Sequence, residues 1–241
     1  MKIHLNPFSI SPLNTHYDGT YTEQMKQWRR LGAKDKANNL RSLTGSRRFQ
    51  SILEVGCGTG SVLAQMSQHH LAEKYCGIDM ADPNLHRDET ASGIELLQYD
   101  GARTPFEDKS FELVFATHVV EHVPDPRSFI AELARVTREY VYIEVPCELN
   151  IRVSQKKLQS SVDTGHINMY TPESFLLLLQ TSKLKVEHLE LFDHSLDVLS
   201  FPNSPFKGLM LKAARTSLLK FNPILASRVF TYHCGALCRV V

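Results

Sequence analysis

Short apolar runs alternate along this chain with stretches whose apolar residues recur at helical spacing. Runs of the first kind predict buried strands, and stretches of the second kind predict helices. The predicted strands are residues 52–55, 75–78, 94–98, 111–116, 141–145, 184–192 and 228–241, and the main predicted helices are 23–43, one from Gly60, one from Pro126, one from Pro172 and 207–221. This alternation predicts an α/β fold with a doubly wound, mostly parallel seven-stranded sheet and helices on both faces.

Helix-start signals support two of these helices. Asp125 precedes Pro126, and Thr171 precedes Pro172, which is the order of an N-cap residue followed by proline in the first turn. The predicted helix at 207–221 is amphipathic, with one apolar face formed by Leu211, Ala214, Leu218 and Phe221. This face fits core cover, a subunit contact, a roof over a substrate pocket or contact with a membrane surface.

The first predicted strand ends at a turn with three glycines, Gly56-Cys57-Gly58-Thr59-Gly60, and a helix follows. Strand, glycine turn and helix form a unit that binds nucleotide-like ligands, because glycine lets the backbone turn tightly and lets a ligand approach closely. A dinucleotide fingerprint would place glycine or alanine where this chain has Ser61. An acid, Glu54, lies two residues before the first glycine.

The stretch E-V-G-C-G-T-G resembles the first motif of class I S-adenosylmethionine (SAM)-dependent methyltransferases, in which the turn wraps the amino-acid end of SAM. The resemblance implies a Rossmann-like methyltransferase fold and SAM as cofactor. It also implies cofactor contacts from the turn and the acid before it, namely Glu54, Gly56, Cys57, Gly58 and Gly60. The cysteine in this turn is common in the family and is not a nucleophile there.

Polar residues also follow the next strands, where ligands of open α/β sheets bind. Asp79 ends the second strand and can accept hydrogen bonds from both ribose hydroxyls. The resemblance implies that Asp100 accepts from the adenine amine and that the Gly101-Ala102 backbone bonds the ring nitrogens. Met80 and Thr117, after the second and fourth strands, complete the predicted cofactor-binding set. Two further acids of the second loop, Asp82 and Asp88, are interpreted as solvated.

Residues 100–114 and the Glu121-His122 pair resemble the widespread small-molecule methyltransferase group, in which that pair supports the fold. Methyl transfer from a sulfonium depends mainly on holding donor and acceptor in line, and a base is needed only when the acceptor arrives protonated. His118, just past the fourth strand, and His166, in Gly-His-Ile-Asn-Met-Tyr, are the two candidate catalytic residues. Each is interpreted either as a base or substrate contact or as a polar residue that is merely hydrogen-bonded under a loop.

Composition restricts the remaining choices. The 241 residues carry a net charge of +1, so charge gives no case for nucleic acid as partner. No apolar run reaches the roughly 20 residues that span a bilayer, and no signal-peptide core begins the chain. Five cysteines without a C-x-x-C pair favour a cytoplasmic protein. His233, Cys234 and Cys238 on one strand cannot complete a four-ligand shell, so no metal site is expected.

A single domain over 1–241 is expected, with an N-terminal arm or lid (1–44), a SAM-binding core (45–192) and an insertion with the final strand (193–241). The basic helix at 23–43 is either a solvated cover or a lid, in which Tyr17, Tyr21 and Trp28 close the site and a cation pairs with the SAM carboxylate.

The sequence therefore predicts a SAM-dependent methyltransferase for a small molecule or biosynthetic intermediate, with oxygen slightly preferred over nitrogen. The absence of an N/D-P-P-Y/F signature after the fourth strand weighs against DNA. A non-catalytic SAM-binding partner or sensor and an NAD-linked oxidoreductase are the alternatives. A homodimer through 207–221 is left open.

Overall fold

The computed structural model describes residues 7–10 and 22–241. Seven strands form one sheet in the order β3-β2-β1-β4-β5-β7-β6. Strands β1 to β5 pair in parallel, and β7 runs antiparallel to both of its neighbours. The strands are β1 (Phe49–Val55), β2 (Ala72–Asp79), β3 (Glu95–Gln98), β4 (Phe111–Thr117), β5 (Thr137–Pro146), β6 (Leu184–Phe192) and β7 (His233–Val240). The predicted doubly wound, mostly parallel seven-stranded sheet is confirmed.

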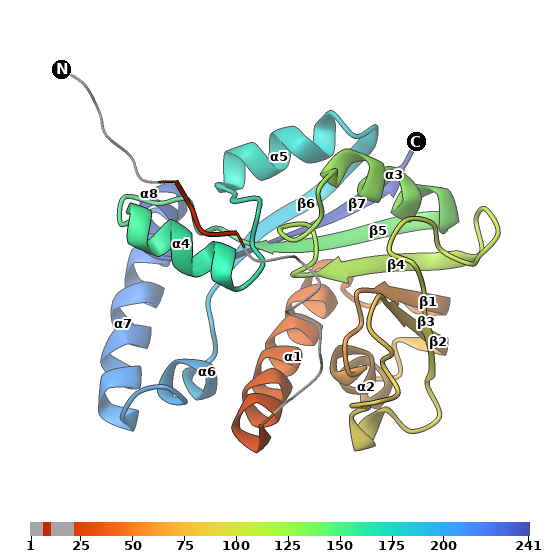
Figure 1. Ribbon diagram of the computed structural model, residues 1–241, viewed down its shortest axis with the longest axis horizontal. Helices are drawn as coiled ribbons and strands as arrows, with labels where there is room; N and C mark the ends of the chain where they lie inside the picture. The colour runs from red at the N-terminus through yellow and green to blue at the C-terminus, as the bar shows by residue number, and fades with distance from the viewer. Residues whose placement is uncertain (1–6, 11–21) are drawn as a thin grey trace.

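Helices cover both faces of the sheet (Figure 1). They are α1 (Glu23–Thr44), α2 (Ser61–Gln68), α3 (Pro126–Val136), α4 (Gln155–Asp163), α5 (Pro172–Gln180), α6 (Leu196–Ser200), α7 (Pro205–Phe221) and α8 (Pro223–Val229). Helices α3 and α5 bury one apolar layer against the sheet, and α1 and α2 bury a second layer against the opposite face. Within the described ranges, no helix combines the length and apolar character needed to cross a membrane.

The predicted helix starts are confirmed at α3 and α5. The Asp125 carboxylate accepts hydrogen bonds from the first backbone amides of α3, and Pro126 occupies the first turn. Thr171, directly before Pro172, and Ser174, two residues after it, form a reciprocal capping box at the start of α5. These caps satisfy amides that have no partner inside the helix, which fixes where each helix begins.

The last predicted strand, 228–241, is wrong at its start. Asn222 caps a further helix, α8, whose first residue is Pro223, and β7 begins only at His233. The sequence Val-Phe-Thr-Tyr before His233 has high strand propensity, but its backbone leads from α8 into the sheet.

The apolar face predicted for 207–221 is also partly wrong. Ala214 and Phe221 are exposed in α7, and the buried position is held by Arg215. The Arg215 guanidinium pairs with Asp193 at 2.6 Å and lies 4.5 Å from the centre of the Tyr232 ring. A buried ion pair therefore fixes this helix where the pattern predicted an apolar contact.

Two long connections of the chain lie near the carboxyl ends of the central strands. Residues 147–170 contain α4, and residues 194–227 contain α6, α7 and most of α8. In Figure 1, α4, α6 and α7 lie toward the side of the sheet where the β4 and β5 arrows end. Both connections are thus near the edge at which ligands of such sheets bind.

Candidate active site

The glycine turn after β1 needs its glycines. Gly56, Gly58 and Gly60 all have positive φ values, of 82°, 53° and 78°, a backbone conformation that residues with a Cβ rarely adopt. The amides of Gly56 and Cys57 both donate to the carbonyl of Ile78 at the end of β2. The turn is therefore held against β2 and leads directly into α2, whose N-cap is Gly60. Burial raises the pKa of the Cys57 thiol, so this cysteine is not an activated nucleophile.

Asp79 lies directly against this turn. Its Oδ2 accepts a hydrogen bond from the Gly58 amide at 2.7 Å, and its Oδ1 accepts from the Ala81 amide at 3.0 Å. Burial raises the pKa of Asp79, and these two amides oppose that shift. Each carboxylate oxygen has a second lone pair, so Asp79 can brace the turn and still accept from ligand hydroxyls.

The loop after β3 contains Asp100 and Gly101 and lies beside Met80, the residue that follows β2. Met80 is half exposed, and a Cβ added to Gly101 would stand 2.6 Å from its sulfur. Asp100 Oδ1 accepts hydrogen bonds from the amides of Ala102 and Arg103, which lower the pKa of Asp100. The Ala102 amide thus donates to Asp100 in this structure, and a contact between this backbone and an adenine nitrogen stays a prediction.

Asp88 is not the solvated loop acid that was predicted. It is buried and accepts hydrogen bonds from the Ser61 hydroxyl at 2.7 Å and from Thr90, and Arg30 of α1 lies 3.2 Å away. Burial alone would raise the pKa of Asp88, but the hydrogen bonds from Ser61 and Thr90 lower it. Asp88 therefore ties the start of α2, the β2–β3 loop and α1 together beside the glycine turn.

Helix α1 brings two cations to the site. The Arg29 guanidinium lies 3.4 Å from the position of a Cβ on Gly58, and its charge opposes the rise in the Asp79 pKa. Burial lowers the pKa of Lys36, which lies among the carboxylates of Glu144, Glu121 and Glu54. Trp28 is half exposed, and the Tyr17 and Tyr21 of the predicted lid lie outside the described residues. The basic helix is therefore not a purely solvated face.

Glu54 and Thr117 are both buried at the ends of their strands. Burial raises the pKa of Glu54 well above its usual range, and its Oε2 has no hydrogen-bond partner among the described residues. Thr117 pairs in register with Glu144 on β5. Glu54 thus keeps an acceptor atom unused just before the turn.

His166 is held by a carboxylate. Its Nδ1 lies 2.6 Å from Glu148 Oε2, and its ring packs edge-on against His122 with ring centres 4.8 Å apart. Burial would lower the pKa of His166, but the bond to Glu148 raises it above its ordinary value of 6.5. A carboxylate that fixes one ring nitrogen leaves the other nitrogen oriented for proton transfer.

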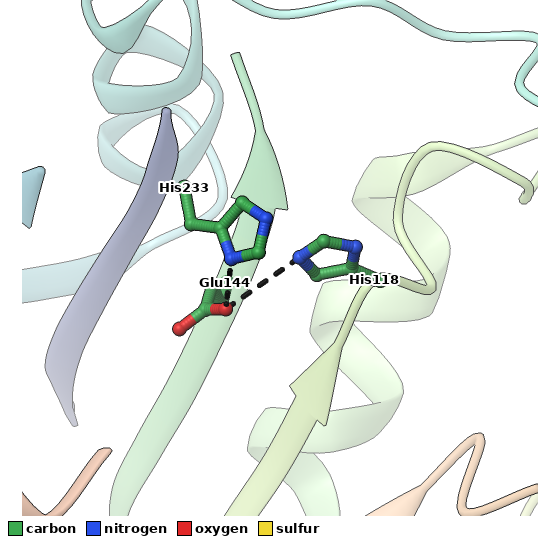
Figure 2. Close-up of side chains that lie close together, drawn as sticks. All are labelled: His118, Glu144 and His233. Carbon is green, nitrogen blue, oxygen red and sulfur yellow. Dashed lines mark ion pairs between the residues drawn. The ribbon is translucent and has the colours of Figure 1, made fainter. Parts of the chain in front are cut away.

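His118 faces into the protein. Its backbone φ is +59°, which is unusual for a residue with a side chain, and its Nε2 lies 3.5 Å from Glu144 Oε1 (Figure 2). On the other side of the same oxygen, His233 Nδ1 lies 3.1 Å away. Burial lowers the pKa of His118 well below its usual range, so the imidazole is neutral. The two candidate histidines therefore differ. His118 belongs to a buried cluster with Glu144 and His233, whereas His166 is paired with the carboxylate of Glu148.

Glu121 lies between these two histidines. It is fully buried, both of its carboxylate oxygens lack a hydrogen-bond partner within the described part of the chain, and His118 Nδ1 is 3.8 Å from Oε1. Burial raises the pKa of Glu121 to about 7. Its backbone carbonyl accepts from the amides of Ile167 and Asn168, and His122 bonds the Gly165 carbonyl. Glu121 and His122 therefore connect two loops, as the resemblance to the family implies. The Glu121 carboxylate itself is a buried polar group without a hydrogen bond among the described residues.

The cysteines near His233 lie away from it. Cys234 and Cys238 belong to the apolar layer under α3 and α5, whereas His233 points to Glu144 on the opposite face. Successive residues of a strand point to opposite faces, so these three side chains do not converge. Ligating atoms instead approach within 4.8 Å of one another in two other groups of the described residues, His118/Glu144/His233 and Glu121/His122/His166.

The parallel strands, the glycine turn and the acids at the strand ends define the class: an α/β protein with a nucleotide-binding edge. Residues 53–143 match the family model described as a methyltransferase domain. These residues include the end of β1, the glycine turn and the histidine after β4. The predicted resemblance to the methyltransferases is confirmed.

Curated relatives are methyltransferases with different acceptors. The chain is 28% identical to a tocopherol O-methyltransferase of Arabidopsis thaliana (47% of this chain, 35% of that protein) and 25% identical to an ajmaline N-methyltransferase of Rauvolfia serpentina (70% and 61%). It is 31% identical to a ubiquinone biosynthesis O-methyltransferase of Maricaulis maris (40% of each chain). The chain thus spans between 35% and 61% of the length of these relatives.

Solved structures share the fold over nearly the whole chain. A geranyl diphosphate methyltransferase in complex with SAM superposes with a TM-score of 0.64 at 15% identity, covering 97% of this chain and 98% of that one. The cyclase SpnF superposes with a TM-score of 0.60 at 14% identity, covering 93% and 85%. A fold shared by a methyltransferase and a cyclase does not fix an activity, which depends on the site.

Proposed function

We propose that this chain is a SAM-dependent methyltransferase acting on a small molecule or biosynthetic intermediate, with oxygen favoured over nitrogen as the acceptor atom. The contact that carries the proposal is the 2.7 Å hydrogen bond from the Gly58 amide to Asp79, which places the predicted ribose acid against the glycine turn. The methyltransferase match over 53–143 supports it. Tocopherol and ubiquinone O-methyltransferases among the relatives support oxygen as the acceptor atom.

The residues at the strand ends fit SAM. The turn formed by 56–60 and the acid Glu54 would receive the amino-acid end, and Arg29 lies where a cation could pair with its carboxylate. Asp79 would hold the ribose, and the exposed thioether of Met80 with the Asp100 loop would hold the adenine. When bound, SAM supplies a methyl group on a positively charged sulfur, a good leaving group.

His166 is proposed as the catalytic base for a protonated acceptor. The Glu148 carboxylate orients its ring, and the partly buried side chain is set in the 147–170 segment near the carboxyl end of β5. His118, the other candidate, is not proposed as the base, because its ring faces Glu144 and His233. A single domain and a cytoplasmic location remain predictions, the latter supported by five free cysteines.

Two rivals make different predictions. The alternative of a non-catalytic SAM-binding partner is consistent with the same turn and with Asp79, and differs only in the absence of turnover. The NAD-linked alternative is opposed by Ser61, which occupies the third fingerprint position and bonds Asp88 at 2.7 Å. Nucleic acid is not proposed as an acceptor because the net charge is only +1.

The test is formation of S-adenosylhomocysteine (SAH) from SAM with a panel of phenols, carboxylic acids and amines. The wild type should form SAH only with an acceptor. Asp79→Asn should raise the KM for SAM about 10- to 100-fold, and the variant of a neighbouring loop acid, Asp82→Asn, should not. SAM binding without turnover on any acceptor would favour the partner or sensor. A melting temperature raised by NADH and not by SAH would favour the oxidoreductase.

A further inference from the structure

We propose that His118, Glu144 and His233 form a binding site for a divalent transition-metal ion of the zinc type. The three side chains converge from the end of β4, from β5 and from the first residue of β7 (Figure 2). No two of them are closer than 26 residues apart in sequence, so only the register of the sheet brings them together. The proposal does not depend on methyl transfer.

The distances match a shared ion. His118 Nε2 and His233 Nδ1 lie 3.5 Å and 3.1 Å from the same atom, Glu144 Oε1. Two ligand atoms that are bound to one tetrahedral zinc ion at its normal bond lengths stand about 3.3–3.5 Å apart. All three ligating atoms lie within 4.8 Å of one another, so small side-chain adjustments would bring them to one ion.

Two of these atoms have ion-pair neighbours within the cluster but no hydrogen bond from the part of the chain that the structure describes. Glu144 Oε1 and His118 Nε2 are both buried without a hydrogen-bond partner among the described residues, and the Glu144 side chain is 0% exposed. Buried polar atoms of native proteins are almost always satisfied by a partner, a water or an ion. The site is also not closed, because the His118 side chain remains 21% exposed and offers an entry path.

The surroundings of the cluster resemble the outer shell of a metal site. Tyr142 and Asn39 donate hydrogen bonds to Glu144 Oε2, at 2.6 Å and 3.0 Å, which fixes the carboxylate and directs Oε1 at the histidines. The other nitrogen of His118, Nδ1, faces Glu121 at 3.8 Å. A carboxylate behind a ligating histidine is the usual arrangement around metals.

Charge and donor type favour the same ion. Glu144 is one of three buried acids grouped around Lys36, together with Glu54 and Glu121, and a bound cation would offset its negative charge. Two imidazole nitrogens and one carboxylate oxygen suit zinc and related metals more than magnesium or calcium. Three protein ligands also leave a coordination position open for water or for an oxygen of a ligand.

The experiment uses the whole chain, stripped with a chelator and titrated with Co²⁺ while visible absorption is recorded. One Co²⁺ per chain should bind and be displaced by Zn²⁺. His233→Ala and the isosteric Glu144→Gln should each weaken binding by more than about 100-fold, since even outer-shell partners are worth 10- to 100-fold. His188→Ala, an exposed histidine of β6, should bind as the wild type does.

A second control separates the neighbouring group of Glu121, His122 and His166. His122→Ala should retain cobalt binding if the ion lies on Glu144. Melting curves of the variants without metal establish that each is folded. Absent binding in the wild type, binding unchanged in both His233→Ala and Glu144→Gln, or loss of binding only in His122→Ala would overturn the proposal.

Discussion

Gly56 and Gly93 have the same backbone φ of 82° but different surroundings. A Cβ on Gly56 would stand 2.3 Å from Val119 Cγ2, whereas a Cβ on Gly93 would meet nothing within 4 Å. Both alanine variants carry the cost of a positive φ, so their difference isolates the clash. We expect Gly56→Ala to lower the free energy of unfolding by about 1–3 kcal/mol more than Gly93→Ala, measured by urea denaturation. Equal losses would show that Val119 does not hold the turn.

The pH dependence of catalysis should report on His166. A base must be deprotonated, and the Glu148 carboxylate raises the pKa of His166 above 6.5. The value of kcat/KM should therefore be low below this pKa and rise as pH increases through it. His166→Gln should lower kcat by about 100-fold or more and remove that rise. His69→Gln, at the end of α2, is the control, and a pH profile identical in His166→Gln would exclude His166 as the base.

Residues that belong to one sequence motif could be singled out from the sequence. Residues whose partners come from distant parts of the chain could not. The glycine turn, Asp79 and Asp100 could be assigned from neighbouring sequence. Asp88 could not, because its partners Ser61 and Arg30 come from two other elements. The closeness of Glu144 and His233 depends on the β5–β7 register, in which His233 stands opposite Pro146, and no local pattern encodes this register.

At the scale of elements, α7 is held to the sheet by charge. The side chains of Arg215 and Asp193 are each only 6% exposed and pair at 2.6 Å. Removing Arg215 takes away the more buried cation of Asp193 and leaves Lys212, which lies 3.0 Å away with its side chain 30% exposed, as the remaining partner of that buried carboxylate. We expect Arg215→Met to cost about 3 kcal/mol of unfolding free energy, and the double variant with Asp193→Asn to cost less than that.

The matched control for this prediction is Arg228→Met. Arg228 pairs with Glu173 at 2.9 Å, but both side chains are about half exposed. An exposed pair contributes at most about 1 kcal/mol, so this variant should remain close to the wild type in urea denaturation. A loss for Arg215→Met as small as that for Arg228→Met would contradict the role assigned to the buried pair.

Elements were predictable where hydrophobic period and caps agree. The strand at 184–192 and the starts of α3 and α5 were predicted at the observed residues. The helix α8 was missed because the strand-forming residues after it outweighed its start signal, Asn222 before Pro223. The face of α7 was mispredicted because an ion pair with Asp193, which the periodicity of the helix does not register, occupies the buried side.

For the molecule as a whole, the site combines parts from all along the chain. Helix α1 contributes Arg29 and Lys36, the turn after β1 and the loop after β2 contribute the cofactor edge, and 147–170 contributes His166 with Glu148. The order of the sheet brings these parts to one edge. The central claim is therefore that a single edge binds SAM through the turn and Asp79.

Calorimetric titration with SAH, on the wild type and on Asp79→Asn, tests this claim most directly. Each wild-type chain should bind one SAH with micromolar affinity. Binding to Asp79→Asn should be about 10- to 100-fold weaker, because a hydrogen bond to a charged group is worth about 1.5–3 kcal/mol. A wild type that binds no SAH, or a variant that binds it equally well, would show that this edge does not bind SAM through Asp79.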